Sequence, residues 1–515
     1  MQQNRLIAPL LVALGSIALT GCVTVGPDYK IPGDAVVNKV ETAEPFASGQ
    51  NKAFSQNPLP DHWWRLYDDP MLNSLIEKAL AENTDLRIAQ ANLARSRAVL
   101  EEVEMGRIPQ VDLSAQPKFG RSSAAANGAP HRYADKWTGD TGINVSYQLD
   151  LFGKISRGIE SASASADAAQ AAYDLVQVTV AADTAKAYAD ACSSAYRVKI
   201  AQRSAGLLKD FHRTTKQLAQ AGRSSVIEVA RVAAQYESMN ATIPPLQAQQ
   251  RLAIYRLSVL TGEVPTALVS QVGQCSRIPQ LKQPIPIGDG AELIRRRPDI
   301  RQAERNLAAA NAKIGVATAD LYPSINLGLS GGITSRLSDF GETNTYRWGF
   351  GPLISWTIPD TGTARARIKE AEADTQAAYA RFDATVLNAL RETESSLTTY
   401  ARELERNASL KAARDQSALA SSQTSRLYKH GRIDFLSKLD AERAYVIAEA
   451  AYAASSAQLA DDQIAIFLAL GGGWEQNDEQ VQQIIAKNKT AIPDKVEKTI
   501  EETVEEIMEG NAENP

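Results

Sequence analysis

Two long stretches of the chain, at about residues 154–220 and 363–430, have the apolar rhythm of an α-helix and contain no proline. At 1.5 Å per residue, each would form a helix about 100 Å long. Helices of this length call for coiled-coil packing against neighbouring helices. In the second stretch, seam positions recur at alternating intervals of three and four residues. These positions are Leu387, Leu390, Glu394, Leu397, Ala401, Leu404 and Ala408.

Four shorter segments alternate between apolar and polar residues, which is the period of a β-strand. Their apolar sets are Val111, Leu113 and Ala115; Ile143, Val145, Tyr147, Leu149 and Leu151; Ile325, Leu327 and Leu329; and Trp348, Phe350, Ile354 and Trp356. Polar, turn-rich stretches at residues 121–131 and 335–345 join these segments into two pairs. A single apolar face is typical of a barrel wall that meets lipid, and also of a soluble hairpin packed on helices. The pattern alone leaves both interpretations open.

The chain also contains a tandem duplication. The residues Asp85-Leu86-Arg87-Ile88-Ala89 match Asp299-Ile300-Arg301-Gln302-Ala303 at an offset of 214 positions. Further along, Gly222-Arg223 matches Gly431-Arg432 at an offset of 209 positions. Because an ordered series of matches needs only one change of offset, chance does not explain it. We predict a first repeat at residues 70–262, a linker at 263–290 and a second repeat at 291–471.

Both repeats have the same order of elements. A first helix, at about residues 70–107 or 291–320, is closed by a proline. A strand pair and one of the long helices follow, and a Gly-Arg turn then leads into a returning helix. In the first repeat Pro244-Pro245 must interrupt the returning helix, whereas the second repeat has Ala453-Ala454 at the matching positions.

The first residues are typical of an export signal. Residues 1–5 carry a positive charge, and the apolar stretch at residues 6–19 is too short to span a bilayer. Leu19-Thr20-Gly21-Cys22 resembles a bacterial lipobox, and an ordinary secretory signal is the alternative. We expect a lipoprotein signal peptide at residues 1–21, a covalent lipid on Cys22 and an N-terminal periplasmic segment at residues 22–69. Val23 in place of an aspartate indicates the outer membrane, by resemblance to enterobacterial sorting.

No other segment approaches 18 consecutive apolar residues, so a membrane crossing would need β-strands. Together with the lipobox, this favours the membrane interpretation of the two strand pairs. Two pairs supply only four strands, and a barrel removes its exposed edges only when it closes. We therefore expect an oligomer, whose subunit number the pattern does not give.

Charge and candidate chemistry exclude several classes of protein. A formal net charge of −5 at pH 7 excludes a general basic nucleic-acid binder. The four histidines have no HExxH spacing, and no CxxC pair, phosphate-binding loop or GxSxG motif is present. We predict no enzyme, no metal site and no cofactor besides the lipid. Cys192 is interpreted as a small residue in a helix interface, with a Cys192–Cys275 disulfide left open. The acidic tail at residues 472–515 is interpreted as a solvated or disordered end.

Landmarks from residue 21 to residue 474 resemble the TolC-type outer-membrane efflux proteins, specifically their NodT-type lipoprotein branch. They are Gly21-Cys22, Val25-Gly26-Pro27-Asp28-Tyr29, Trp63-Trp64, Asp69-Pro70-Met71-Leu72, Asp150-Leu151-Phe152-Gly153, Arg296-Arg297-Pro298-Asp299-Ile300 with Ala303-Glu304, and Ala469-Leu470-Gly471-Gly472-Gly473-Trp474. The resemblance implies a mainly α fold with a membrane β part. In it, a homotrimer forms a twelve-stranded β-barrel, with four strands per chain, that continues into a long periplasmic α-helical barrel. It also implies passive export, with a periplasmic adaptor linking the channel to an inner-membrane resistance-nodulation-division pump.

The two Gly-Arg turns each connect antiparallel helices. Glycine supplies the left-handed conformation at the helix end, and Ser224 or Asp434 would cap the returning helix. Turn formation alone explains the glycines. The resemblance implies in addition that these turns form the periplasmic tip where the adaptor docks. The tip residues are Gly222, Arg223, Ser224, Gly431, Arg432 and Asp434.

A charged segment follows the second turn. Asp440 and Arg443 are three residues apart on one helix face, which by itself predicts a local surface ion pair. The resemblance instead places Leu436, Asp440 and Arg443 at the constriction that closes the tunnel. Arg231 occupies the position of the first repeat that matches Asp440, so an acid in one hairpin would face a base in the neighbouring hairpin.

We therefore predict the outer-membrane channel of a tripartite efflux system, which exports drugs or other small toxic compounds and contributes to antibiotic resistance. Its partners would be further copies of the chain, the adaptor, the pump and outer-membrane lipid, but no nucleic acid. A duct for protein secretion or for metal ions is the alternative within transport. A lipid-anchored coiled-coil scaffold without a pore is the alternative from another class, and the strand pairs favour the channel.

Overall fold

A computed structural model of the chain describes residues 24–472, except residue 122, residues 124–129, residues 276 and 282, and residues 357–360. The predicted signal peptide, Cys22 and the acidic tail beyond residue 472 lie outside the described residues. The described chain forms two compact units. Among the described residues, unit 1 is drawn from the segment that ends at Ser48, from Glu82–Val176 and from Asp289–Ser395, and unit 2 from Gly49–Ala81, Gln177–Gly288 and the segment that begins at Ser396. Each unit therefore takes segments from both repeats.

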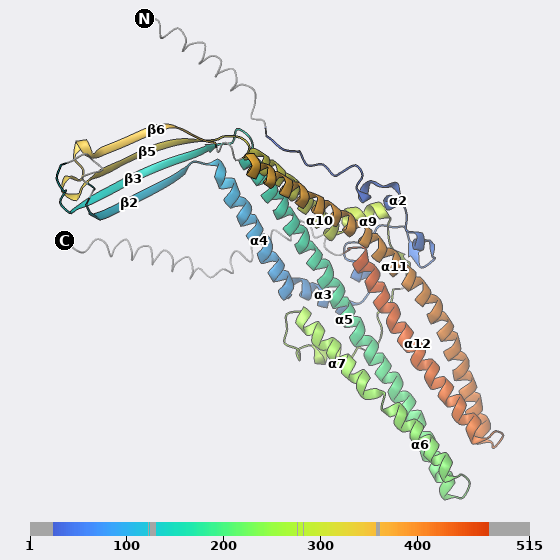
Figure 1. Cartoon of the computed structure of the whole chain (residues 1–515). Coiled ribbons are helices and arrows are strands. Elements are labelled where there is room, and N and C mark those ends of the chain that lie inside the picture. The colour runs from blue at the N-terminus through green and yellow to red at the C-terminus, as the bar shows by residue number, and fades with distance from the viewer. Residues whose placement is uncertain are drawn as a thin grey trace. The chain divides into compact units, whose positions relative to one another are not determined.

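Unit 1 contains a four-stranded antiparallel sheet in the order β2-β3-β5-β6 (Figure 1). The strands are β2 (Gln110–Gly120), β3 (Lys136–Leu149), β5 (Ser324–Arg336) and β6 (Tyr346–Ser355). The two outer pairings, β2 with β3 and β5 with β6, are the predicted strand pairs. The central pairing of β3 with β5 joins the two repeats in one sheet.

The two predicted long helices are confirmed as α5 (Lys154–Gln220) and α11 (Thr361–Lys429). The returning helix of the second repeat, α12 (Phe435–Ala469), is continuous. The first repeat returns instead through α6 (Val226–Asn240) and α7 (Ile243–Leu260). The two prolines lie in the first turn of α7, where a missing N–H leaves no intrahelical bond unmade. Both predictions about the returning helices are thus confirmed.

The prediction of one continuous first helix in each repeat is wrong, because the structure has two helices there. In the first repeat these are α3 (Pro70–Glu82) and α4 (Thr84–Glu104), and in the second α9 (Gly290–Arg296) and α10 (Pro298–Ala319). Asn83 separates the first two, since its side chain accepts hydrogen bonds from the first backbone N–H groups of α4. Extended Arg297, which precedes a proline, separates the second two.

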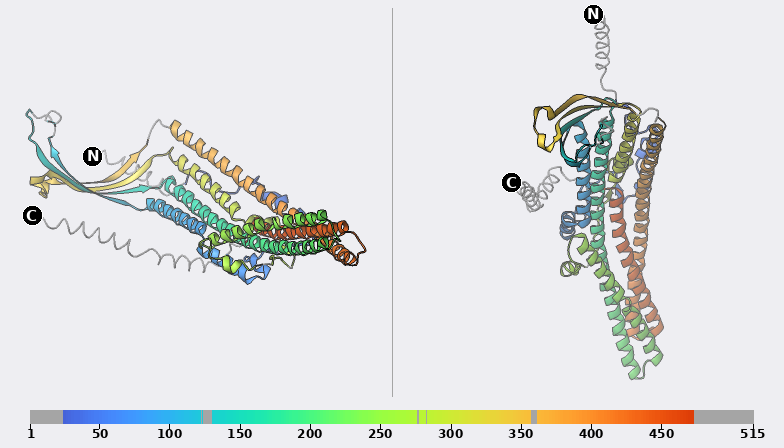
Figure 2. Two further views of the ribbon diagram at one scale, coloured as in Figure 1. Left: turned by 90° about the horizontal axis from the view of Figure 1, so that it is seen from below. Right: turned by 60° about the vertical axis from the view of Figure 1, so that its left-hand side comes forward.

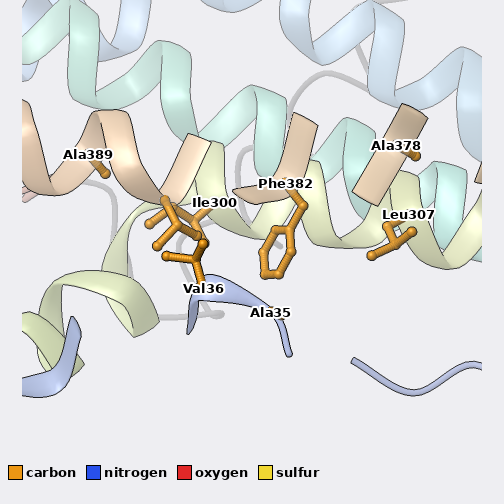
Figure 3. Packing of buried hydrophobic residues seen from close by; sticks show 8 residues of the cluster. Ala35, Val36, Ile300, Leu307, Ala378, Phe382 and Ala389 are labelled. Atoms are coloured by element: carbon orange, nitrogen blue, oxygen red, sulfur yellow. The ribbon is translucent and has the colours of Figure 1, made fainter. Parts of the chain in front are cut away.

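The core of unit 1 includes the segment that follows the predicted lipidation site. Figure 3 shows Ala35 and Val36 of this segment beside Ile300 of α10 and Phe382 of α11. The backbone N–H of Val36 also donates to Asp383 Oδ1 at 2.9 Å. A short helix, α2 (Val40–Ala43), follows. These contacts fix the N-terminal segment on two helices of the second repeat.

The core of unit 2 combines aromatic residues and a small parallel strand pair. Trp63 stacks on Phe467 of α12, with ring centroids 4.5 Å apart. Strand β1 (Phe54–Ser55) pairs with β4 (Ile285–Pro286), and α8 (Val269–Val272) lies in the linker between the repeats. Two-residue strands are too short to produce an alternating pattern, so the sequence did not reveal them.

A disulfide joins Cys192 of α5 to Cys275 in the linker, 83 positions later. It settles the alternative that the sequence left open. Cys192 is also fully buried, as a small residue in a helix interface would be.

In unit 2 the turns after α5 and α11 lie at the same end, and both views of Figure 2 show them together. None of the helices in the described part of the chain combines the length and the apolar character needed to cross a bilayer.

Candidate functional site

The turn after α5 has the left-handed conformation that its glycine predicts. Gly222 has a φ of +70°, and the N–H of Arg223 donates to the carbonyl oxygen of Leu218 at 2.8 Å. This six-to-one bond closes a Schellman-type helix end. The predicted cap is displaced by one residue: Ser225 forms the capping box with Glu228, while the Ser224 hydroxyl donates to the Glu228 carboxylate. The sequence has two adjacent serines whose hydroxyls could cap the helix, and Ser225 is the one that directly precedes it.

The turn after α11 repeats this backbone shape. Gly431 has a φ of +67°, and the N–H of Arg432 donates to the carbonyl oxygen of Leu427 at 3.0 Å. Asp434 caps α12 as predicted, accepting the Ser437 N–H at 2.8 Å. This hydrogen bond lowers the pKa of the Asp434 carboxyl below its usual value, because it favours the charged form.

Both turns present a cation to solvent. Arg223 and Arg432 are exposed and lie at equivalent places in the two turns. A Cβ added to either turn glycine would meet no atom within 4 Å. The end of unit 2 therefore carries two similarly shaped, open turns, each with an exposed arginine.

The candidate gate residues lie on the helices that return from these turns. Leu436 is 49% exposed on α12, and Asp440 and Arg443 are exposed one and two turns further on. Arg231 is exposed on α6. Within the described residues of a single chain, Asp440 forms an ion pair with neither Arg443 nor Arg231.

An aromatic cluster close to the turns was not predicted from the sequence. Phe211 of α5, Val232 of α6, and Phe435 and Leu439 of α12 are all buried, and Tyr428 of α11 packs against them. Phenylalanines in otherwise alanine-rich helices are a weak signal, because such residues also occur singly on helix surfaces. The cluster brings four helix ends of unit 2 together.

The sheet of unit 1 has one exposed apolar face. Paired residues of neighbouring strands form rows across the four strands, and each row lies on one face of the sheet. One row is Val111, Val145, Leu329 and Phe350, and the next is Leu113, Ile143, Gly331 and Trp348. Leu113 and Trp348 are each 83% exposed. An exposed apolar area of this extent indicates contact with a membrane or another protein.

The opposite face of the sheet is polar. The Arg347 guanidinium donates to Asp140 Oδ1 at 2.7 Å and to Thr334 Oγ1 at 3.0 Å. The register places these side chains on the other surface from the apolar rows. One apolar and one polar face are what a strand wall between lipid and water requires.

Metal binding has no candidate in the part of the chain that the structure describes. No group of three or more histidine, cysteine, aspartate or glutamate side chains is placed to hold an ion there. Cys22, the candidate lipidation site, lies outside the described residues.

Comparison with known proteins defines the class to which these features belong. The sequence matches the model of the outer membrane efflux protein family over residues 75–263 and 291–472. The chain belongs to the outer membrane efflux protein family. It is an efflux channel component of the outer membrane with a helical periplasmic portion, as the sequence predicted.

Individual relatives are similar over most of their length. The chain is 30% identical to nodulation protein T of Rhizobium leguminosarum bv. trifolii, over 89% of this chain and 96% of that protein. It is 26% identical to the cation efflux system protein CusC of Escherichia coli K12, over 91% and 99% of the two chains. It is 27% identical to the antibiotic efflux pump outer membrane protein ArpC of Pseudomonas putida, over 92% and 97%.

Among solved structures, the outer-membrane channel OprN is similar with a TM-score of 0.81 and 36% identity, covering 88% of this chain and all of that one. This similarity confirms the predicted fold class, in which long helices combine with a β part.

Proposed function

We propose that three copies of this chain form a passive export duct. The observation that carries this proposal is the four-stranded sheet, which has one exposed apolar face. Strands β2 and β6 are the edges of that sheet within the described chain, and exposed edges favour pairing with further strands. Three sheets paired edge to edge would give a closed twelve-stranded barrel with lipid outside and water inside. The helices would continue the duct into the periplasm.

Planar-bilayer recording of the purified protein tests the duct. We expect single-channel steps from the assembled wild type, of a size that depends on salt concentration. A lipid-anchored scaffold without a pore would give none. Cross-linking with increasing reagent would measure the subunit number, and a ladder that stops at three supports the trimer.

The two open turns would be the docking site for a periplasmic adaptor, with an inner-membrane resistance-nodulation-division pump behind it. Exposed Arg223 and Arg432 support this assignment, because arginine is enriched in interfaces. The residues that would make contact are Gly222, Arg223, Ser224, Gly431, Arg432 and Asp434. A cysteine scan of the two turns, with cross-linking to the co-expressed adaptor, would map the interface.

The gate would lie just above this tip and use Leu436, Asp440, Arg443 and Arg231. Around a threefold axis, the Asp440 carboxylates would repel one another unless each finds a cation. Because Asp440 has no partner within the described chain, an arginine of a neighbouring chain would serve. Such pairs contribute roughly 1 kcal/mol each in a partly wet tunnel, so three would bias an equilibrium between closed and open states.

The cargo we propose is drugs or other small toxic compounds. ArpC, named for antibiotic efflux, supports this assignment, whereas CusC, named for cations, favours metal ions as the alternative. Deleting the gene and measuring growth with antibiotics and with copper or silver salts separates the two.

We propose further that the chain has no catalytic role and holds no cofactor apart from the lipid on Cys22. The segment after Cys22 supports a fixed position for that lipid. The Val25 N–H donates to the Phe152 carbonyl oxygen at 3.2 Å, and the buried Arg157 guanidinium binds Asp28 at 2.7 Å. The anchor would therefore be held beside the junction between β3 and α5.

A further inference from the structure

Lys438 of α12 lies over two aromatic rings that belong to other helices. Its Nζ atom is 3.9 Å from the centroid of the Phe211 ring on α5 and 5.1 Å from that of Tyr428 on α11. Both distances are within the range of a cation–π interaction, which is strongest where the cation is partly desolvated. Lys438 meets that condition because it is partly buried, and this burial lowers the pKa of its ammonium group below the usual value.

The rings themselves are held in place. Phe211 is 5% exposed, its centroid lies 5.4 Å from that of Phe435, and the Tyr428 ring meets it edge-on at an interplanar angle of 83°. Fully buried Val232 of α6 completes the group. The cation therefore contacts rigid rings close to both turns. It also connects the first hairpin, α5 and α6, to the second hairpin, α11 and α12.

The duplication shows that this contact exists only once per chain. At the offset of 209 positions, Ala420 stands in the second repeat where the first has Phe211. Val229 stands in the first repeat where the second has Lys438, and Ala219 where it has Tyr428. If the first hairpin supplied the residue that matches Lys438 and the second hairpin the residue that matches Phe211, valine would meet alanine, with neither a cation nor a ring.

We propose that Lys438, between Phe211 and Tyr428, is a positioning residue that fastens the two hairpins of one chain to each other near the tip. This inference rests on the proposed duct, in which hairpins of several chains alternate around one ring. The junction within a chain carries the cation–π contact, and the reverse junction between chains lacks it.

Hydrogen exchange of the full-length protein in detergent tests the contact without requiring a pore. Lys438→Met keeps the aliphatic stem and removes the charge. We expect amides near residues 205–220 and 425–440 to exchange about 5- to 10-fold faster than in wild type. Lys438→Arg keeps a cation over the rings and should stay within about twofold of wild type. Lys216→Met, at an exposed position of α5, is the matched control and should change nothing.

Two results would overturn the proposal: unchanged exchange in Lys438→Met, or equal acceleration in the arginine variant, which would show that packing alone matters. If Lys438→Met does not assemble, Tyr428→Leu removes one ring and is judged by the same rates. Adding Lys438→Met to Phe211→Leu should accelerate exchange little beyond Phe211→Leu alone, because the nearer of the two rings is already absent. Bilayer recording distinguishes the two proposals. A wild type without conductance refutes the duct, whereas unchanged exchange refutes the contact.

Discussion

Replacing Gly222 by proline should weaken adaptor docking more than it weakens assembly of the channel. Gly222 has a φ of +70°, whereas proline requires about −65°, so the backbone must rotate by roughly 135° at this residue. The change also removes the N–H that donates to the Ala219 carbonyl oxygen at 3.0 Å. The neighbouring bond from Arg223 to Leu218 depends on the same conformation and would be lost as well.

The size of the effect follows from these losses. An L-residue in the left-handed region costs about 1–2 kcal/mol, and proline, which cannot enter it, costs about 3 kcal/mol or more. A Cβ added to the native backbone at Gly222 would meet no atom within 4 Å, so other parts of the chain do not crowd the turn. The cost is therefore confined to the turn, and the free energy of assembly should change little.

Two matched variants separate backbone shape from other effects. Gly222→Asn keeps the turn, because asparagine enters the left-handed region more easily than other side chains, and should dock nearly normally. Val226→Pro introduces a proline at the exposed first position of α6, where proline is tolerated. Docking would be measured by cross-linking to the adaptor, and assembly by the temperature at which the oligomer dissociates. Normal cross-linking of an intact Gly222→Pro oligomer would refute the assignment of the tip.

Four further changes have defined outcomes. Cys22→Ser should abolish labelling by radioactive palmitate, because the thioether needs sulfur, and persistent label would exclude lipidation there. Asp440→Ala should raise single-channel conductance and admit bulky antibiotics, whereas unchanged conductance in an assembled mutant would leave an exposed surface residue as the explanation. Cys275→Ser removes the disulfide and should destabilise the protein by about 2–4 kcal/mol in thermal unfolding. Burial and the Asp461 charge raise the pKa of Asp190 to about 6. Between about pH 4 and pH 6 the folded state therefore holds a proton that the unfolded state has lost, so stability falls as pH rises through this range. Asp190→Asn should flatten this decline in the melting temperature.

Local periodicity was sufficient to predict the helices and strands, but not the contacts between residues far apart in the sequence. The periods of α5 and β2 are properties of consecutive residues, so they are visible in the sequence. The break at Asn83 was missed because one buried amide, rather than a proline or glycine, ends the hydrogen-bond ladder there. The pairing of β1 with β4 joins residues more than 200 positions apart through backbone bonds, which no side-chain pattern records.

The candidate site was predictable to the same extent. The turn glycines follow from helix-end stereochemistry, so the conformations at Gly222 and Gly431 were correctly predicted. The ion pair of Asp440 and Arg443 was suggested by spacing alone, and the described chain does not form it. Residues at this spacing can form an exposed ion pair, but such a pair contributes only a few tenths of a kcal/mol, which is too little to hold two solvated side chains together.

The two repeats share a backbone conformation at their turns and differ in the side chains nearby. Both copies have a left-handed glycine after the long helix, because an antiparallel helical hairpin requires that backbone. Only one copy supplies the lysine, and only the other supplies the phenylalanine ring of the contact between Lys438 and Phe211. A ring of identical hairpins would have identical junctions and no preferred place to open. In the proposed ring, divergence of a few side chains on a repeated backbone would make the junctions within chains differ from the junctions between chains.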